Sequence, residues 1–89
     1  MFQDGAEPDP AAQSPERLRA RLERLFEYPP TRERDGEVAL VYLALASQTS
    51  GAERERAFLA GYSYARTSRH PEARERAERL RGELDAWKR

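Results

Sequence analysis

The longest apolar run in this chain extends from Val38 to Ala46, and it limits the possible folds more than any other feature. The run lies in "EVALVYLALASQTS", whose single charged residue is the first one. A buried strand could have this pattern, but its alanines and leucines favour a helix, and no second segment offers a pairing strand. The run therefore predicts a central, most buried helix. Its main face is expected to hold Val38, Val41, Tyr42 and Leu45, with Leu40 and Leu43 on the flank.

A first helix is predicted within "SPERLRARLERLFEYPP". Ser14 can cap the free amides at its start, and Pro15 suits the first helical position because its missing N–H is not needed there. The helix is expected to end at Tyr28, because the two prolines that follow disfavour helical backbone. The next segment, "TRERDG", is interpreted as a polar loop, with Asp35 as the cap of the central helix.

Two more helices are predicted in the second half of the chain. The third opens with "SGAE", in which Ser50 and Glu53 have the spacing of a capping box. The residues from Ser68 to His70 interrupt the apolar pattern, and Pro71 is expected to begin the fourth helix. The sequence thus predicts an all-α fold, either a small four-helix bundle or an array of helical hairpins.

The size and charge of the chain favour one small domain with wide polar faces. The chain has 89 residues, of which 36% are charged and 38% hydrophobic. Residues 1–13, "MFQDGAEPDPAAQ", are interpreted as a disordered tail whose removal leaves stability nearly unchanged, and residues 14–89 as a single helical domain. A core of this size is only marginally sufficient, so burial of apolar surface by a partner is plausible.

Several classes of function are not expected. The chain has no cysteine, which excludes disulfides, thiolate metal ligands and thiol catalysis. The only histidine, His70, stands beside Pro71 and is interpreted as a turn residue. No serine or glycine lies in a nucleophile elbow or a phosphate loop, so neither an enzyme nor a bound cofactor or metal is predicted. An acidic N-terminus and the lack of a long apolar run predict a cytoplasmic protein without membrane contact.

The segment "GYSYARTSRHPEA" has Gly61, then Tyr64, then Ala73 across a short polar turn. This spacing resembles that of one tetratricopeptide repeat, and the likeness covers residues 57–85. The repeat has tryptophan, leucine, phenylalanine and proline where this chain has Ala57, Ala60, Ala77 and Asp85. The resemblance implies a closely packed helical hairpin with a groove for a peptide or helix. A lone repeat cannot cover its own apolar face, so the first two helices or a second chain are expected to do so.

The apolar residues of the fourth helix follow one another at alternating steps of four and three, as in a narrow heptad seam. Small residues near the turn let two helices approach closely, and large ones fill the wider end. The sequence therefore predicts a non-catalytic protein-interaction module or accessory subunit that self-associates, as a homodimer, through this seam. Tyr62 or Tyr64, which point in different directions, is the expected second anchor. The seam consists of Ala73, Ala77, Leu80, Leu84 and Trp87.

A nucleic-acid-binding or regulatory protein is the alternative. Acidic residues are concentrated before the first helix, so the rest of the chain is basic, and its arginines could contact phosphates. Neighbouring glutamates dilute this charge, and no recognition helix or base-stacking motif is found. The candidate phosphate contacts are Arg17, Arg21 and Arg24 on the first helix and Arg66 and Arg69 beside the third-to-fourth turn.

Overall fold

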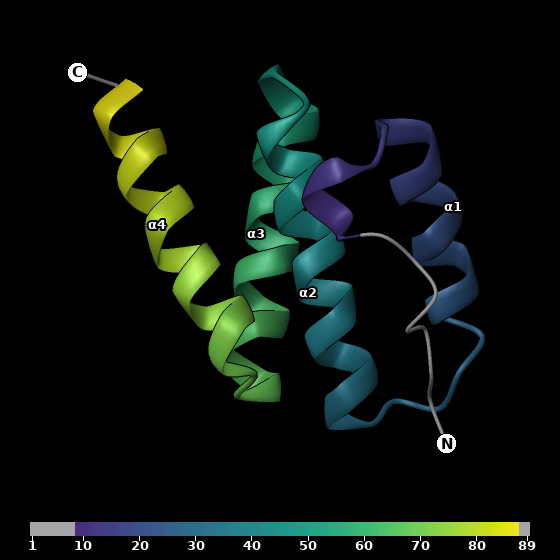
Figure 1. Cartoon of the computed structure of the whole chain (residues 1–89). Coiled ribbons are helices and arrows are strands. Elements are labelled where there is room, and N and C mark those ends of the chain that lie inside the picture. The colour runs from purple at the N-terminus through teal and green to yellow at the C-terminus, as the bar shows by residue number, and fades with distance from the viewer. Residues whose placement is uncertain (1–8, 88–89) are drawn as a thin grey trace.

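The computed structural model describes residues 9–87, apart from the side chains of residues 11, 86 and 87. This part of the chain forms four α-helices that run alternately up and down, preceded by one short 3-10 helix, so the all-α prediction is confirmed (Figure 1). The elements are η1 (Pro10–Ala12), α1 (Pro15–Leu25), α2 (Arg32–Ser47), α3 (Gly51–Ser68) and α4 (Pro71–Trp87). None of these helices is both long and apolar enough to cross a membrane.

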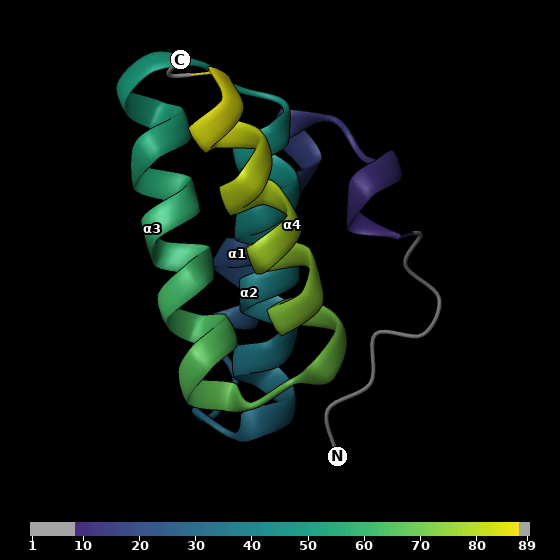
Figure 2. The same cartoon turned by 90° about the vertical axis from the view of Figure 1, so that its left-hand side faces the viewer.

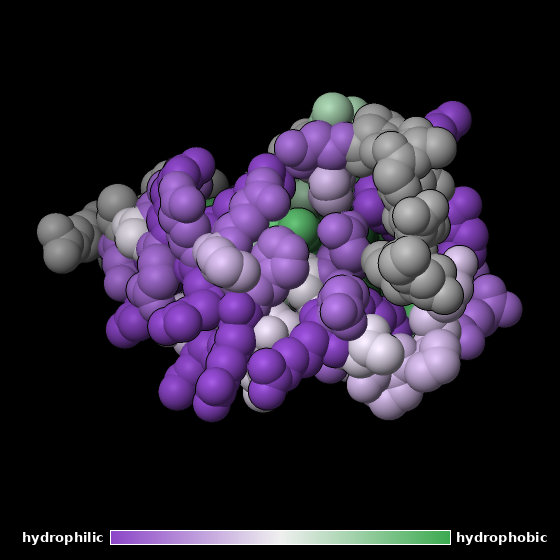
Figure 3. Space-filling model, turned by 60° about the horizontal axis from the view of Figure 1, so that its bottom comes forward, coloured by the Kyte–Doolittle hydropathy of each residue, from purple (hydrophilic) through white to green (hydrophobic). Residues whose placement is uncertain are grey.

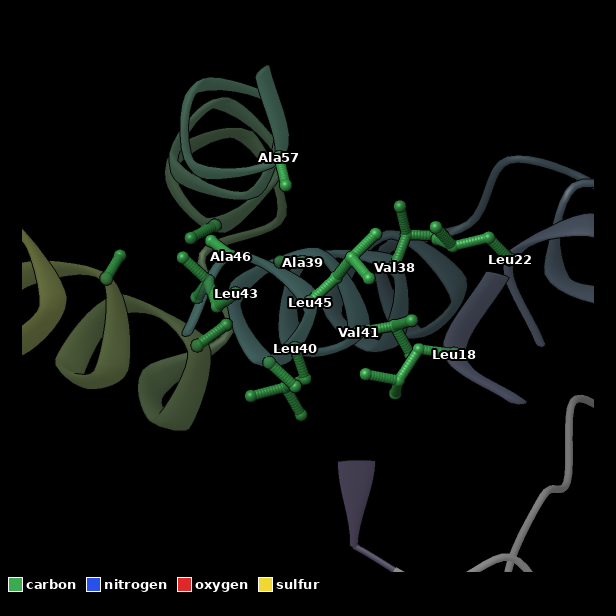
Figure 4. Packing of buried hydrophobic residues seen from close by; sticks show 14 of the residues in the cluster. Leu18, Leu22, Val38, Ala39, Leu40, Val41, Leu43, Leu45, Ala46 and Ala57 are labelled. Atoms are coloured by element: carbon green, nitrogen blue, oxygen red, sulfur yellow. The ribbon is translucent and has the colours of Figure 1, made fainter. Parts of the chain in front are cut away.

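Helix α2 is the centre of the fold, as predicted. It contacts η1, α1, α3 and α4, and every residue from Val38 to Ala46 is buried except the half-buried Tyr42. In Figure 4, Leu18 and Leu22 of α1 lie against α2. The predicted division of α2 into a main face and a flank is wrong, because elements on several sides cover the helix. Leu40 and Leu43 are as deeply buried as Leu45.

The α1–α2 connection differs from its prediction at both ends. Helix α1 ends at Leu25 and not at Tyr28, since the chain already turns at Phe26. Helix α2 begins at Arg32, inside the predicted loop, where the Thr31 hydroxyl accepts a hydrogen bond from the Arg34 amide at 3.2 Å. Asp35 is therefore not the cap. It lies in the first turn and pairs with Arg34 at 2.7 Å, a place where the helix dipole favours an acid.

The start of α3 is predicted correctly, but its capping box does not form. Ser50 is the N-cap residue, yet its side chain makes no capping hydrogen bond. The Glu53 carboxylate instead accepts a hydrogen bond from the guanidinium of Arg19 on α1, at 2.6 Å. A contact between helices thus replaces the local one.

The α3–α4 turn confirms that His70 is a turn residue. Helix α3 ends at Ser68 because Arg69 adopts left-handed backbone, with φ of 58°. His70 Nδ1 accepts a hydrogen bond from the Ala73 amide at 3.2 Å and so caps α4, which begins at Pro71 as predicted. The His70 ring also lies against Gly36, where a Cβ atom would overlap it. The turn is thereby tied to the beginning of α2.

Part of the predicted tail is packed on the core. Pro10 and Gln13 are buried, and the side chain of Gln48 donates a hydrogen bond to the Gln13 carbonyl oxygen at 2.7 Å. Asp9 pairs with Arg76 of α4 at 3.2 Å, and this hydrogen bond raises the arginine pKa. The folded body therefore begins before Ser14. Residues 1–8 of the predicted tail lie outside the described residues.

Gly61 lies at a close helix crossing, as expected from the cost of glycine within a helix. A Cβ atom there would lie 2.9 Å from Leu43 Cγ and 3.1 Å from Tyr42 Cβ. Both neighbours belong to α2, so the glycine serves the α2–α3 contact and not the α3–α4 hairpin that the repeat resemblance implies.

Truncations measure how much the packed residues before α1 stabilise the fold. Deletion of Met1–Gln13 should lower the free energy of unfolding by about 1–3 kcal/mol relative to deletion of Met1–Pro8. The longer deletion removes the buried Pro10 and the Gln13 carbonyl oxygen that accepts the hydrogen bond of Gln48. Urea unfolding followed by circular dichroism gives both values. Equal values for the two truncated chains would show that residues 9–13 add nothing to stability.

Two identical substitutions at different glycines separate packing from helix propensity. Gly61→Ala should destabilise the protein by about 1 kcal/mol net, because the new methyl group overpacks against Leu43. Gly82→Ala is the control, since nothing lies within 4 Å of a Cβ atom there. It should stabilise by about 1 kcal/mol through propensity alone. Thermal unfolding shows whether each substitution stabilises or destabilises the protein. Stabilisation by both substitutions would contradict the close α2–α3 crossing.

Candidate protein-binding groove

The predicted seam of α4 lies mostly within the core of its own chain. Ala73, Ala77 and Leu80 are buried in the core cluster, and Leu84 is partly buried against it. They pack where α4 lies on α2 and α3, a contact that the periodicity of α4 alone does not specify. These three buried residues have little surface left for a second chain. The side chain of Trp87 lies outside the described residues, so its predicted place at an interface stays a prediction.

A groove opens where α4 leaves α3. The two helices are close at their shared turn, and α4 tilts away from α3 toward its C-terminal end (Figure 1). Figure 2 shows the same pair of helices from the α4 side. The groove between them has a volume of about 550 Å³. It is lined by Gly51, Arg54, Glu55, Phe58 and Leu59 of α3 and by Arg81, Leu84 and Asp85 of α4.

The groove has an apolar part that is open to solvent. Leu59 is 66% exposed, more than any other exposed large hydrophobic residue among those described. Beside it, Phe58 and Leu84 are only partly covered by the core. A single exposed leucine is common on protein surfaces, but a leucine beside a hollow with two more apolar side chains is a typical docking feature.

Tyr62 joins the two helices between the groove and the turn. Its hydroxyl donates a hydrogen bond to Glu78 of α4 at 2.8 Å, and its ring lies 5.7 Å from that of Phe58. The guanidinium of Arg81 lies 6.0 Å from the Tyr62 ring centroid, within the range of a cation–π contact. Tyr62 therefore holds α3 and α4 together where the groove begins.

Tyr64 points to the opposite side, which confirms that the two tyrosines face different directions. Its ring stacks on Tyr42 of α2, with centroids 6.1 Å apart, and lies 6.2 Å from Phe26. Burial of Tyr42, with a smaller effect from Tyr64, raises the pKa of the Tyr42 hydroxyl. This aromatic cluster links the end of α1 and the middle of α3 to α2, and its rings mainly contact one another.

The five candidate arginines do not form one surface. Arg21 is only 3% exposed, and its guanidinium bonds Glu37 of α2 at 2.9 Å, so the expected stripe on the first helix is interrupted. The other four are exposed, on α1 and at the end of α3. Figure 3 shows that the end of the molecule near the α3–α4 turn is covered mainly by hydrophilic side chains, with no single extended apolar area.

The described residues include no group of three or more histidine or acidic side chains placed to hold a metal ion. The residues that line the groove include both apolar and charged side chains.

The periodicity of the sequence does not identify Phe58 and Leu59 as site residues, because apolar residues at helical spacing are typical of a helix face that packs in the core. A signal that could have found them is the width of the apolar surface of α3. Phe58, Leu59, Tyr62 and Tyr64 together span more of a helix than one neighbouring helix can cover.

Comparisons with known proteins add no relative from which a function could be transferred. No protein-family model matches the chain, and neither a curated protein nor a solved structure is similar to it at a significant level.

Proposed function

We propose that this chain is a non-catalytic helical interaction module or accessory subunit, which takes up apolar side chains of a partner protein in the α3–α4 groove. The observation that carries this proposal is the exposed Leu59 beside the partly covered Phe58 and Leu84. Full burial of one such side chain stabilises a complex by roughly 1.5–3 kcal/mol. A helix laid into a groove between two others is a common way to achieve this burial.

The composition of the groove supports a protein partner more than a small molecule. Its lining combines apolar side chains with arginine and acidic side chains, and protein interfaces likewise combine apolar with polar and charged contacts. The likeness of residues 57–85 to a tetratricopeptide repeat agrees with this, since it implies a hairpin with a groove. Self-association and a cytoplasmic location, both expected from the sequence, belong to the same proposal.

Nucleic-acid binding has less support. The burial of Arg21 removes one of the five candidate phosphate contacts. Of the other four, Arg17 and Arg24 lie on α1, and Arg66 and Arg69 lie at the end of α3 and in the turn after it. Retention on DNA or RNA that falls steeply with salt would favour this alternative.

Substitution of Leu59 tests the groove without disturbing the core, because the side chain is mostly exposed. Leu59→Glu should reduce protein binding at least tenfold, since a charge would have to enter the apolar interface. Arg56→Gln is the matched control, because it makes the same change in net charge on an exposed part of α3 outside the groove lining. Thermal unfolding of each variant is compared with that of the natural chain.

The binding measurement has two parts. Sedimentation equilibrium detects self-association, and immobilised chain in an extract of its own cells detects other protein partners. The proposal expects one of these interactions to be lost in Leu59→Glu and kept in Arg56→Gln. It is wrong if the folded Leu59→Glu variant behaves like the control in both measurements.

A further inference from the structure

We infer that the occupant of the groove is a second copy of this chain, with the two α4 helices antiparallel across a two-fold axis. This inference rests on the proposed function, because it uses the same groove and names its partner. The axis would pass at the level of Glu83, between Arg81 and Asp85. The α3 and α4 helices of both copies would then form a four-helix arrangement around the two grooves.

The shape of the groove is suited to a copy of itself. In a two-fold dimer the same surface must supply both the projecting group and the hollow that receives it. This surface does so, because Leu59 projects 66% exposed at the edge of a groove of about 550 Å³. The leucine of each copy would enter the groove of the other and cover Phe58 and Leu84.

The charged residues that line the groove are also suited to a copy of the same surface. The lining residues include two arginines, Arg54 and Arg81, and two acids, Glu55 and Asp85. Their charges cancel, so neither a strongly acidic nor a strongly basic partner would gain net attraction. A partner that presents an acid to Arg81 and a base to Asp85 would gain attraction at both, and an antiparallel copy of α4 presents that order.

The geometry of α4 makes the pairing specific. Arg81 and Asp85 are separated by about one helical turn, and both line the groove. Consider two antiparallel helices related by a two-fold axis that passes midway between these two positions. The first position of one copy then lies opposite the second position of the other copy. Arg81 would therefore face Asp85 of the second copy, and the symmetric pair would form on the other side of the axis.

Among the described residues, neither group has a close partner of opposite charge. Earlier in α4, Glu72 and Glu75 each bond the arginine four residues later at 2.7 Å. Asp85 makes no ion pair with any of the described residues, and it lies near the C-terminus of α4, where the helix dipole disfavours an acid. Arg81 reaches Glu78 only at 3.8 Å and is 57% exposed. Its other contacts are with the uncharged Tyr62, whose hydroxyl accepts a hydrogen bond from Arg81 at 3.3 Å and whose ring centroid lies 6.0 Å away. A second copy would supply the opposite charge to each.

Charge reversal tests this pairing directly. Arg81→Glu alone and Asp85→Arg alone should each weaken dimerisation by about tenfold or more, because each homodimer then contains two like-charged pairs. An equimolar mixture of the two variants should dimerise to within about threefold of the natural chain, since both pairs across the axis are again opposite in sign. A single chain that carries both changes should recover in the same way. Sedimentation equilibrium at micromolar concentration and near-physiological salt measures all four samples.

A control pair on the same helix excludes a general effect of net charge. Glu75→Arg and Arg79→Glu make the same changes in charge, but both positions are more than 60% exposed and neither lines the groove. These two variants should dimerise like the natural chain. Circular dichroism shows whether each variant is folded, and recovery in the mixture is itself proof that the single variants can fold.

The outcomes separate this inference from the proposed function. Loss in the single variants with recovery in the mixture supports the two-fold pairing. Single variants that dimerise like the natural chain, or a mixture that does not recover, overturn it. A natural chain that is monomeric at about 100 μM but binds another protein through Leu59 overturns the second copy as occupant and leaves the interaction module intact. A monomer with no Leu59-dependent binding defeats both.

Discussion

The burial of α2 is the constraint on which the rest of the structure depends. The residues from Val38 to Ala46 would lose most of their stabilising effect if one side of the helix faced water. Every other element therefore covers some part of it, and the covering elements differ in the size of the residues that they contribute. Helix α1 contributes leucines, whereas α3 and α4 contribute mainly small residues. The small residues in the core are Ala57, Gly61 and Ala65 of α3 and Ala73 and Ala77 of α4.

The small residues of α3 explain why a groove exists at all. Ala57, Gly61 and Ala65 recur every four residues, so they form one stripe along α3 that brings its backbone close to the large side chains of α2. Because that stripe packs against α2, the large side chains of α3 must lie on the other sides of α3. Near the turn α4 covers them, but its tilt leaves Phe58 and Leu59 without a full cover. The open apolar surface is thus a result of how the core is packed.

Features with a local cause could be predicted from the sequence. The caps at Ser14 and Ser50 and the proline at position 71 place the helix starts correctly, and the unbroken apolar run identifies the central helix. These signals act within a few residues, so the pattern alone contains them.

Features that depend on contacts between distant segments could not be predicted in the same way. Glu53 has the correct spacing for a capping box but bonds Arg19. Arg21 has the spacing of a basic stripe on α1, but its side chain is buried against Glu37 of α2. The packing of residues before α1 depends on Gln48, far along the chain. The repeat resemblance implies a groove in this hairpin, but most of the residues that line it could not be predicted, because they follow from the tilt of α4 and not from any motif.

The tilt of α4 also links binding to local folding. Close to the turn, α4 is anchored to the core by Ala73, Ala77 and Leu80, whereas between Arg81 and Asp85 only Leu84 is partly covered by the core. The backbone amides of this segment are therefore protected mainly by the helix itself, and it can open without unfolding α2. Any molecule that covers the groove must hold this segment in helical form. Its measured affinity will include the free energy of ordering the end of α4, and its presence will slow amide hydrogen exchange there first.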